Sequence, residues 1–356
     1  MSSTDFDYLI VGHGIAGAAI AWHLNNTDKS FQIVNDPSAP SSSRVAAGIF
    51  NPLTGKKLNK TWLADDLFPY TYSFYSDLEQ KLKTKFVHSV SVFRPFRSIE
   101  EQNTYLAYSA DSSISYYIGN NYDQEPISEY IRMDHGGLEV ISSGWIDLPI
   151  LLDKSKDYFS QKNRYLEAAF DTSDLNIHED HVEWNGRKYG KIILCQGYAA
   201  VENSLFSWLK FNPVKGEILE IATENILKPY IINQGIFILP TTNRSFKVGA
   251  TYAWDNLDWA ATEEAAKELE EKLKLLIKIP YKITGQTAGI RPSVDDRRPL
   301  IGFHPEYNNV CIFNGLGTKG VTLAPFFADQ FVQHLVNGKE LNPLVNIKRY
   351  FSLYFH

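Results

Sequence analysis

The sequence predicts an α/β protein, with a dinucleotide-binding domain on a parallel sheet and a smaller α+β domain with a mainly antiparallel sheet. Three observations lead to this fold class. An apolar run at residues 8–11 stops at closely spaced glycines and passes into an Ala-rich apolar segment, which predicts strand, tight turn and helix. A second apolar run, residues 31–34, ends in polar residues. Short β-type runs in the middle of the chain predict the second domain.

The glycines after the first run have the spacing of a dinucleotide-binding fingerprint, Gly12-x-Gly14-x-x-Gly17. Gly12 permits the turn, Gly14 lets the backbone approach a pyrophosphate, and Gly17 lets helix and strand touch. The helix that begins with Ile15 and Ala16 offers unpaired N–H groups to the anion. The pattern alone is common in loops, but its context favours a Rossmann-like nucleotide site, with NAD and FAD both open.

The second apolar run ends at Asn35 and Asp36, about 20 residues beyond the glycines, where a ribose-binding acid belongs. In the usual alignment of this motif, the position of the acid is occupied by Asn35. Either Asn35 accepts the ribose hydroxyl bond, or Asp36 does so after a shift of one residue. The fingerprint histidine, His13, is expected only to pack near the phosphates.

Composition describes an ordinary globular protein. The 356 residues suffice for two domains with sizeable cores, and a net charge of -6 argues against a protein-wide attraction to nucleic acid. Cys195 and Cys311 lie inside apolar runs and are expected to be buried, and we expect no metal site because no metal-ligand spacing is apparent. With neither a signal peptide nor a run of about 18 apolar residues, we expect a cytoplasmic protein without a membrane span.

The segment after Asp36 is rich in Pro and Ser up to Pro52 and is expected to be irregular backbone. A polar loop at this place lies where a bound cofactor would pass. A long helix is expected from Thr61 to Leu82, with an apolar stripe and with tyrosines that serve packing rather than catalysis. The stripe is formed by Tyr70, Phe74, Leu78 and Leu82, and the tyrosines are Tyr70, Tyr72 and Tyr75.

The pattern changes to short β-type runs over residues 86–141, around a polar middle, which predicts an inserted piece of a different domain. Asp147 as N-cap and Pro149 in the first turn predict a helix to about residue 161. The strand at 191–195 then stops near Gly197, as a further edge of the nucleotide-binding sheet would.

Three runs, residues 214–221, 235–240 and 245–251, predict strands of the antiparallel sheet. A capped helix follows, with Thr262 as N-cap. Its expected buried stripe consists of Ala266, Leu269, Leu273 and Leu276.

A second G-x-G-x-x-G, formed by Gly315, Gly317 and Gly320, lies between a strand and a helix over 324–337. We reject a second nucleotide site, because this helix uses most of the remaining chain and leaves no second strand with a terminal acid. The better interpretation is a turn whose helix N-terminus faces the electron-rich end of the first cofactor.

In this order the motifs resemble the D-amino-acid-oxidase-like superfamily of FAD-dependent oxidoreductases, which contains glycine oxidase and sarcosine oxidase. The tail from Gly315 to Pro325 is especially similar to the flavin-oxidase half of the bacterial bifunctional enzyme that modifies the tRNA wobble uridine. The resemblance spans nearly the whole chain. Its matching pieces are the fingerprint, Ser43 to Gly48, Gly144 to Asp147, Pro213 to Gly216, Val248 to Thr251, Gly289 to Pro292 with Asp296, Pro299 and Gly302, and Gly315 to Gly320.

The resemblance implies an FAD-binding domain assembled from separated segments and a smaller substrate domain. The first comprises residues 1–85, 143–216 and 287–356, and the second comprises 86–142 and 217–286. FAD is expected to be non-covalent, because no Cys lies near the block where some relatives attach the flavin. The residues implied to contact it are Gly12, Gly14, Ile15, Ala16, Gly17, Asn35, Asp36, Ser43, Arg44, Ala47, Gly48, Gly197, Arg291, Gly315, Gly317, Thr318, Lys319 and Gly320.

The implied reaction is oxidation of a carbon–nitrogen bond in a small amino acid or secondary amine, with hydride transfer to the flavin N5. Arg291 is the first catalytic candidate, because a guanidinium binds a carboxylate by two parallel hydrogen bonds and relatives with the matching Gly-x-Arg-Pro use it for the substrate acid. The alternative is a surface ion pair with Asp295 or Asp296.

Lys319 is the second catalytic candidate, at a position where sarcosine-oxidase-like members place a Lys that contacts the substrate carboxylate. It could also stabilise the negative charge of the reduced flavin. The alternative is a solvated loop lysine. None of the nine histidines is expected to be catalytic.

Substrate and electron acceptor stay open. Phe237 stands where glycine-oxidase-like members have a carboxylate-binding Tyr, and electrons could pass to oxygen or to another acceptor. A second possible function is a tRNA wobble-uridine oxidase that works with a separate methyltransferase, which the C-terminal motif favours and the acidic mean charge disfavours. A third is a flavoprotein with a binding role and no turnover.

Overall fold

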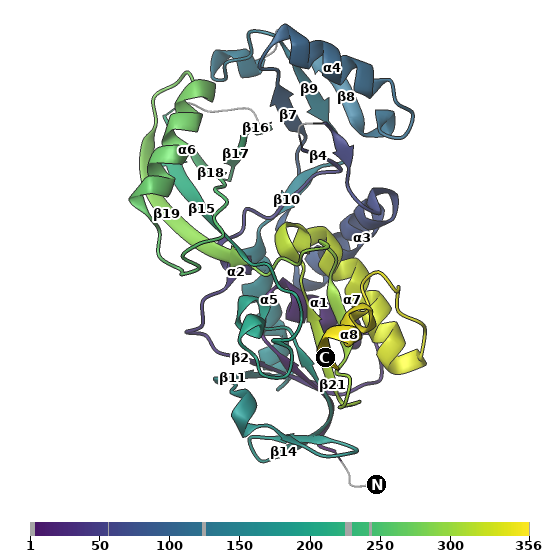
Figure 1. Ribbon diagram of the computed structural model, residues 1–356. Coiled ribbons are helices and arrows are strands. Elements are labelled where there is room, and N and C mark those ends of the chain that lie inside the picture. The colour runs from purple at the N-terminus through teal and green to yellow at the C-terminus, as the bar shows by residue number, and fades with distance from the viewer. Residues whose placement is uncertain (1–3, 56, 123–125, 225–229, 242–243, 356) are drawn as a thin grey trace.

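The computed structural model describes residues 4–55, 57–122, 126–224, 230–241 and 244–355. It contains two sheets of eight strands, one in each of two lobes, which we call the lower and the upper lobe as drawn in Figure 1. Both chain ends lie on the lower lobe (Figure 1). This architecture confirms the predicted α/β fold class. Within the described ranges, no helix is both long and apolar enough to cross a membrane.

Parallel strands form the centre of the lower lobe. The predicted strands are present, and β1 (Phe6–Val11) lies between β2 (Phe31–Asn35) and β14 (Arg187–Leu194). The expectation that the strand at 191–195 forms an edge is wrong, because further strands pair with the side of β14 that faces away from β1. β11 (Tyr165–Glu167) extends the sheet beyond β2, and β21 (Val310–Asn314) extends it beyond β14. All of these strands run in the same direction, so their carboxyl ends lie at one edge.

Antiparallel strands are added to this sheet on the side of β14 that faces away from β1. β13 (Val182–Trp184) pairs with the amino-terminal half of β14 and also with β12 (Asn176–Ile177). β20 (Leu300–Phe303) pairs with β21.

The first helix of the fingerprint, α1 (Ile15–Leu24), is buried along its whole length except at His23. It packs against α5 (Leu148–Gln161) and α7 (Gly320–Asn337). The indole Nε1 of Trp22 donates a 2.8 Å hydrogen bond to an α5 side chain, Ser155 Oγ. An all-apolar, Ala-rich sequence suits this place, because helices approach α1 from more than one side.

The long helix α3 (Ala64–Leu82) begins three residues later than predicted. Leu63, before its first residue, has a φ of 53°, in the left-handed region, and the preceding residues do not continue the helix. The Tyr75 hydroxyl donates a 2.8 Å hydrogen bond to Val321 O on α7, which agrees with a packing role.

The apolar row predicted on α3 is buried at only one of its four positions. Leu78 is buried, but Tyr70, Phe74 and Leu82 are only half-buried. A second apolar row runs beside the predicted one on this helix. It is this second row that faces the core. The buried residues are Ala64, Leu67, Phe68, Thr71, Tyr75 and Leu78.

The upper lobe is built on the second sheet, in the order β19-β15-β18-β17-β16-β7-β9-β8. Neighbouring strands are antiparallel except β16 and β7, which are parallel. The strands are β7 (Val92–Pro95), β8 (Ile118–Tyr122), β9 (Gly137–Val140), β15 (Val214–Ala222), β16 (Ile231–Gln234), β17 (Ile236–Pro240), β18 (Ser245–Gly249) and β19 (Lys282–Arg291). The domain boundaries stay a prediction.

Helix α6 (Glu263–Leu276) covers part of this sheet, as Figure 1 shows. Thr262 caps it as predicted, accepting a 3.3 Å bond from Ala265 N. Ala265 is buried in place of the predicted Ala266, and the other buried positions are Leu269, Leu273 and Leu276.

Three α-helices were missed in the sequence, two of them single turns. α4 (Ile99–Ser109) follows Ser98, whose hydroxyl accepts a 3.1 Å bond from Glu101 N, and the Ser-x-x-Glu spacing of a capping box is a signal that could have revealed it. α2 (Ser42–Val45) is a single turn inside the segment predicted to be irregular.

Smaller elements connect the lobes. β10 (Gly144–Ile146) pairs with β3 (Ile49–Phe50) and β6 (Val87–Ser89) between the two lobes (Figure 1), and β4 (Leu53–Thr54) pairs with β5 (Asn59–Lys60). Single helical turns complete the described chain: η1 (Ser115–Tyr117), η2 (Pro126–Glu129), η3 (Thr172–Asp174), η4 (Gly197–Val201), η5 (Gly317–Lys319), η6 (Ile347–Tyr350) and α8 (Phe351–Tyr354).

Candidate active site

The first glycine-rich turn holds α1 directly against the carboxyl end of β1. Gly12 has a φ of 98°, and a Cβ on it would lie 2.6 Å from Cys195 O. A Cβ on Gly17 would lie 1.9 Å from Gly12 O. Only glycine fits at both positions, because any side chain would collide with backbone atoms.

The N-terminus of α1 is open to an anion. Its N-cap is Gly14, which has no side chain, and its first turn holds no acidic residue. Ile15 N donates a 3.0 Å bond to Ser43 Oγ. The dipole of the helix and the N–H groups of Ala16 and Gly17 therefore suit a pyrophosphate group.

The two candidates for the ribose differ in where they point. Asn35 Oδ1 accepts a 2.9 Å bond from His13 N, so this side chain lies against the fingerprint. Asp36 is turned to its own loop, where its carboxylate accepts bonds of 2.8 Å and 2.6 Å from Ser38 N and Ser38 Oγ. This orientation favours Asn35, although its role stays a prediction.

His13 brings an unpaired nitrogen to the same place. It is buried, and its Nε2 has no hydrogen-bond partner among the described residues. Its ring meets Tyr165 edge-on at 5.0 Å. Burial, reinforced by the charge of Arg44, lowers the pKa of His13 to about 3. A buried, neutral and unpartnered nitrogen beside a phosphate turn fits a site shaped for a bound group.

The loop after β2 lies between α1 and the upper sheet. Ser42 Oγ donates to Ile290 O on β19, and Arg44 forms a 2.6 Å ion pair with Asp153 on α5. Ala47 is half-buried, and Gly48 has a φ of 69° with its Cβ position 2.0 Å from Ile146 O. In this structure the guanidinium of Arg44 is thus engaged with an acid.

The second glycine-rich turn ends beside the first. A Cβ on Gly320, the first residue of α7, would lie 3.2 Å from Ile15 Cγ2, so the two helix starts are neighbours. Gly315 and Gly317 have φ values of 72° and 53°. Thr318 is exposed within η5.

Gly197 is connected to this second turn. Its carbonyl oxygen accepts a 2.9 Å bond from Asn314 Nδ2, immediately before Gly315. Its φ is 58°, and a Cβ would meet nothing within 4 Å, so conformation rather than space requires glycine here.

Lys319 is half-buried rather than solvated. Its Nζ donates a 3.3 Å bond to Thr61 Oγ1, and it has no carboxylate partner within the described ranges. Burial lowers the pKa of Lys319, and the charges of Arg297 and Arg298 lower it further. The ammonium therefore belongs to a group of three cations that repel one another.

Arg291 lies at the end of β19, with its guanidinium across Gly216. A Cβ on Gly216 would be 2.1 Å from Arg291 Nη2, so the glycine makes room for it. Arg291 Nη1 donates a 3.4 Å bond to Thr251 O, and the guanidinium stacks on the Tyr252 ring at 4.6 Å. Burial lowers the pKa of Arg291. Tyr252 is a contact that we did not foresee, although it directly follows the Val248–Thr251 motif.

The alternative ion pair for Arg291 is wrong. Asp296 pairs with Arg349 at 2.8 Å, and Asp295 accepts a 2.9 Å bond from Asn212 Nδ2. No ion pair links Arg291 to an acid in the described part of the chain. Its positive charge is therefore available to a ligand.

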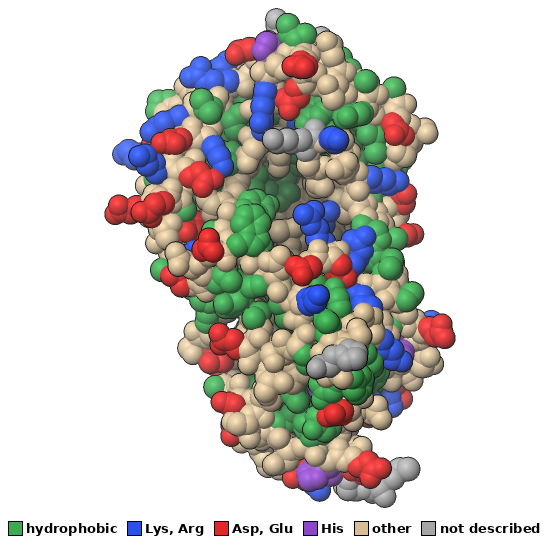
Figure 2. All heavy atoms as spheres, viewed as in Figure 1, with side chains coloured by type: hydrophobic (Ala, Val, Ile, Leu, Met, Phe, Trp, Pro, Cys, Tyr) green, Lys and Arg blue, Asp and Glu red, His purple; other side chains and the backbone are tan. Residues whose placement is uncertain are grey.

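The separated motifs meet in one region. Ser293 N donates a 2.8 Å bond to Arg291 O, and Ser293 Oγ lies 3.4 Å from a Cβ built on Gly317. Gly320 in turn lies beside Ile15, whose Cγ2 would be 3.2 Å from a Cβ built on the glycine. Figure 2 shows a hollow in the middle of the molecule, with hydrophobic and Lys or Arg side chains at its rim. The arrangement can hold a dinucleotide and present cations to an anionic substrate.

A separate cavity of about 360 Å³ lies between α1, α3 and α7. His23, Phe74 and Asp329 contribute to its walls. It includes none of the predicted site residues, and we do not assign the reaction to it.

Comparison with known proteins agrees with this arrangement. The chain matches the family described as DAO, FAD dependent oxidoreductase, over residues 7–333. Glycine oxidase of Bacillus subtilis (strain 168) is 30% identical over 137 residues, which cover 37% of this chain and 36% of that protein. The tRNA 5-methylaminomethyl-2-thiouridine biosynthesis bifunctional protein MnmC of Legionella pneumophila (strain Philadelphia 1) is 24% identical, over 94% of this chain and 55% of that protein.

These curated relatives are matched over only about a third and about half of their own lengths. Solved structures are similar over nearly their full length. Glycine oxidase from Bacillus cereus ATCC 14579 has a TM-score of 0.77 at 18% identity, covering 96% of this chain and 97% of that one. L-proline dehydrogenase from P. horikoshii has a TM-score of 0.76 at 15% identity, covering 98% of each chain. At these identities the likeness shows the fold alone.

Proposed function

Because the chain belongs to the DAO family of FAD-dependent oxidoreductases, we propose that it oxidises a carbon–nitrogen bond in a small amino acid or secondary amine that carries a carboxylate. FAD, when bound, supplies the flavin N5 that accepts the hydride. The observation that carries the proposal is Arg291, a partly buried guanidinium without an acidic partner among the described residues. The chain's own groups then have to bind and orient the substrate.

The glycine-rich turns and the residues between them would hold FAD. The start of α1 offers backbone N–H groups to the pyrophosphate, and Asn35 lies beside it for the ribose. The N-terminus of α7, next to Ile15, would face the electron-rich end of the flavin. We also propose non-covalent binding, which is supported by the burial of Cys195 and Cys311 and by the raised pKa of both thiols.

The charges of Arg291 and Lys319 support an anionic substrate. A cation removed from water without a partner is costly, and a substrate carboxylate would offset that cost. The guanidinium of Arg291 can donate hydrogen bonds to both carboxylate oxygens, and its stacking on Tyr252 limits the orientations that it can adopt. A protein base is unnecessary if the amine binds in its neutral form.

The decisive experiment follows flavin absorbance without oxygen while amino acids and N-methyl amino acids are added. We expect at least one small carboxylated amine to bleach the flavin. In Arg291→Ala its KM should rise by about 10- to 150-fold, the equivalent of one charged hydrogen bond of about 1.5–3 kcal/mol, and Arg291→Lys should recover part of the loss. Arg244→Ala, at an exposed arginine paired with Glu224, is the matched control.

The proposal fails if no small amine bleaches the flavin, or if Arg291→Ala keeps the wild-type KM. Bound FAD that a chemical reductant bleaches but no amine does would favour a flavoprotein without turnover. Whether oxygen accepts the electrons is decided by admitting air after bleaching. The cytoplasmic location expected from the sequence stays a prediction.

A second candidate is a flavin oxidase for a wobble uridine of tRNA. It is favoured by the MnmC alignment over 94% of this chain and by the cations Arg297, Arg298 and Lys319. Arg298 also stacks on the Trp62 ring at 4.0 Å. Altered wobble nucleosides in a deletion strain, restored by the wild type but not by an Arg297→Ala, Arg298→Ala double variant, would favour it. Normal nucleosides in that strain would exclude it.

A further inference from the structure

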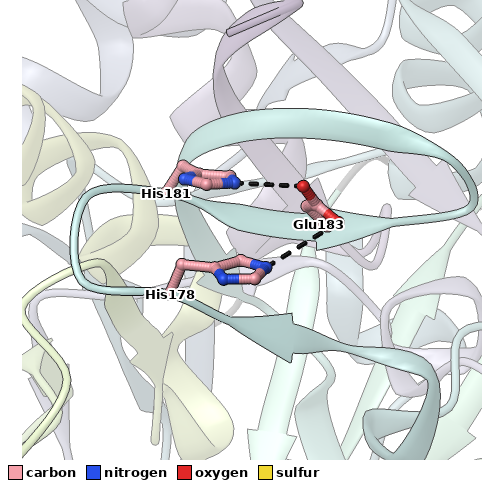
Figure 3. Close-up of side chains that lie close together, drawn as sticks. All are labelled: His178, His181 and Glu183. Atoms are coloured by element: carbon pink, nitrogen blue, oxygen red, sulfur yellow. Dashed lines mark hydrogen bonds and ion pairs between the residues drawn. The ribbon is translucent and has the colours of Figure 1, made fainter. Parts of the chain in front are cut away.

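A histidine-bearing turn closes the hairpin of β12 and β13 at the edge of the lower sheet. Residues 178–181 connect the two strands, and the chain carries His178-x-x-His181-x-Glu183 across them. We had expected no metal site, and this spacing was not singled out in the sequence. The hairpin brings all three side chains to one face (Figure 3).

These side chains form a compact group of three possible metal ligands. Each offers one ligand atom, and the three atoms lie within 4.8 Å of one another. Glu183 reaches His181 Nε2 at 3.1 Å and His178 Nε2 at 3.7 Å. The two imidazole rings are stacked at 4.4 Å with an angle of 11° between their planes. In Figure 3 both rings turn a nitrogen toward the carboxylate of Glu183.

We propose that His178, His181 and Glu183 bind one divalent transition-metal ion of the zinc type. Two imidazoles and one carboxylate are ligands that Zn²⁺ takes in proteins, with water completing the coordination. Ca²⁺ and Mg²⁺ prefer oxygen ligands and should not compete. Binding replaces the contacts between the imidazoles and the carboxylate with bonds to the ion, and requires the two stacked rings to turn out of their parallel arrangement, because a metal ion binds in the plane of each imidazole.

The backbone of the turn is already held in place. The buried side chain of Asn309 donates from Nδ2 to His178 O at 2.8 Å and to His181 O at 2.9 Å. His178 N also bonds His181 O at 3.0 Å across the turn. Less conformational freedom is therefore lost when an ion is bound than in a free loop.

Asp180 orients one of the ligands. Its Oδ1 lies 2.6 Å from His181 Nδ1, so the other nitrogen, Nε2, is directed at Glu183. A carboxylate on the second nitrogen is the usual support of a metal-binding histidine, because it sets the tautomer and the ring orientation. Asp180 is thus a positioning residue for the proposed ion.

Lys188 occupies part of the same carboxylate. Its Nζ lies 3.2 Å from Glu183 Oε1, and the side chain is 40% exposed. A bound cation would repel this ammonium and displace it toward solvent. Removing its charge should therefore strengthen metal binding, whereas a purely structural ion-pair cluster would only be weakened.

The proposed ion is structural rather than catalytic. The hairpin pairs with Tyr189 and the residues before it, at the amino-terminal half of β14. The fingerprint meets the opposite end of that strand, where Gly12 approaches Cys195. Metal should therefore stabilise the hairpin and leave the flavin reaction unchanged.

The test is calorimetric titration of the tag-free holoenzyme, freed of metals with a chelator, with ZnCl₂. We expect uptake of one Zn²⁺ per chain, no uptake of Mg²⁺ or Ca²⁺, and a melting temperature that rises with zinc concentration. Affinity should fall at least tenfold in His178→Ala, His181→Ala and Glu183→Gln, fall less in Asp180→Asn, and rise in Lys188→Gln. His135→Ala is the matched control and should bind as the wild type does.

Two results would overturn the proposal: no heat of binding with zinc, or one equivalent of zinc that the His178→Ala, His181→Ala double variant still binds. Circular dichroism of each variant without metal separates lost binding from lost folding. If a single histidine variant is unfolded, the zinc affinities of Glu183→Gln and Lys188→Gln still test the proposal, because these two substitutions are expected to change the affinity in opposite directions.

Discussion

The closest backbone approach in the candidate site gives the sharpest prediction, for Gly17→Ala. A Cβ at this position would lie 1.9 Å from Gly12 O and 3.0 Å from Gly12 C. Both are backbone atoms of the fingerprint turn, so no side chain can rotate away. The start of α1 must move from β1 by about 1.5 Å to restore an ordinary contact.

Two opposing effects determine the size of the change. Alanine within a helix is favoured over glycine by about 1 kcal/mol, which alone would stabilise the protein. Overpacking of a tight contact costs about 1–3 kcal/mol. If the N–H groups at the start of α1 bind the pyrophosphate as proposed, their displacement also weakens charge-assisted bonds of about 1.5–3 kcal/mol each. We expect lower stability of the apoprotein and a Kd for FAD that is about 10- to 100-fold higher.

The assay titrates apoprotein with FAD and follows the quenching of flavin fluorescence, alongside thermal unfolding of the apoprotein. Gly285→Ala is the matched control, because its Cβ would meet only the flexible Glu220 side chain, at 3.2 Å. If Gly17→Ala binds FAD as tightly as the wild type and melts at the same or a higher temperature, the steric argument for the turn is refuted.

Three further predictions concern single side chains. His13, with a pKa near 3, stays neutral while the unfolded chain protonates below about pH 6.5, so stability falls as the pH drops from 6.5 toward 3, and His13→Gln should reduce that fall in thermal-unfolding scans. Lys319→Met should slow anaerobic flavin reduction by about 10²-fold without lowering the melting temperature, because it removes a cation that has no acidic partner among the described residues; a lower melting temperature would contradict this. Asp147→Ala removes the N-cap bond to Ile150 N and should cost about 1 kcal/mol in denaturant unfolding, against little change for the exposed Asp157→Ala.

The proposed function and the proposed metal site can fail independently. The first depends on cations beside the glycine-rich turns, and the second on a hairpin at the other end of β14. A metal-free enzyme that oxidises amines at the wild-type rate fits both proposals. Loss of turnover in His181→Ala with flavin still bound would contradict only the view that the ion is structural.

Local chemistry made much of this protein predictable from its sequence. Gly12 has a φ of 98°, Gly17 is required by a backbone collision with Gly12 within one turn, and Thr262 and Asp147 cap helices through bonds three residues away. Such effects act between residues that are close together in the sequence, so they can be predicted from the sequence alone. The motifs resembled one family because they recur in a fixed order, and the family match over residues 7–333 confirms that resemblance.

Charge partners could not be predicted, because they join distant segments. Asp296 lies near Arg291 in the sequence but pairs with Arg349, which leaves the guanidinium of Arg291 to stack on Tyr252. Lys319 bonds Thr61 across most of the chain. In each case several partners were compatible with the sequence, and only the packing of the sheets selected one.

The sequence by itself determined the glycine-rich turn after β1, the helix caps, the buried cysteines and the family. The tertiary structure decided which apolar row of α3 faces the core, which of Asn35 and Asp36 lies against the fingerprint, and which cations have no acidic partner among the described residues. It also brought His178 and His181 to Glu183. The reason is the separation along the sequence over which each effect acts. Local backbone sterics and helix capping act within a few residues, whereas burial and charge pairing depend on elements that meet only after folding.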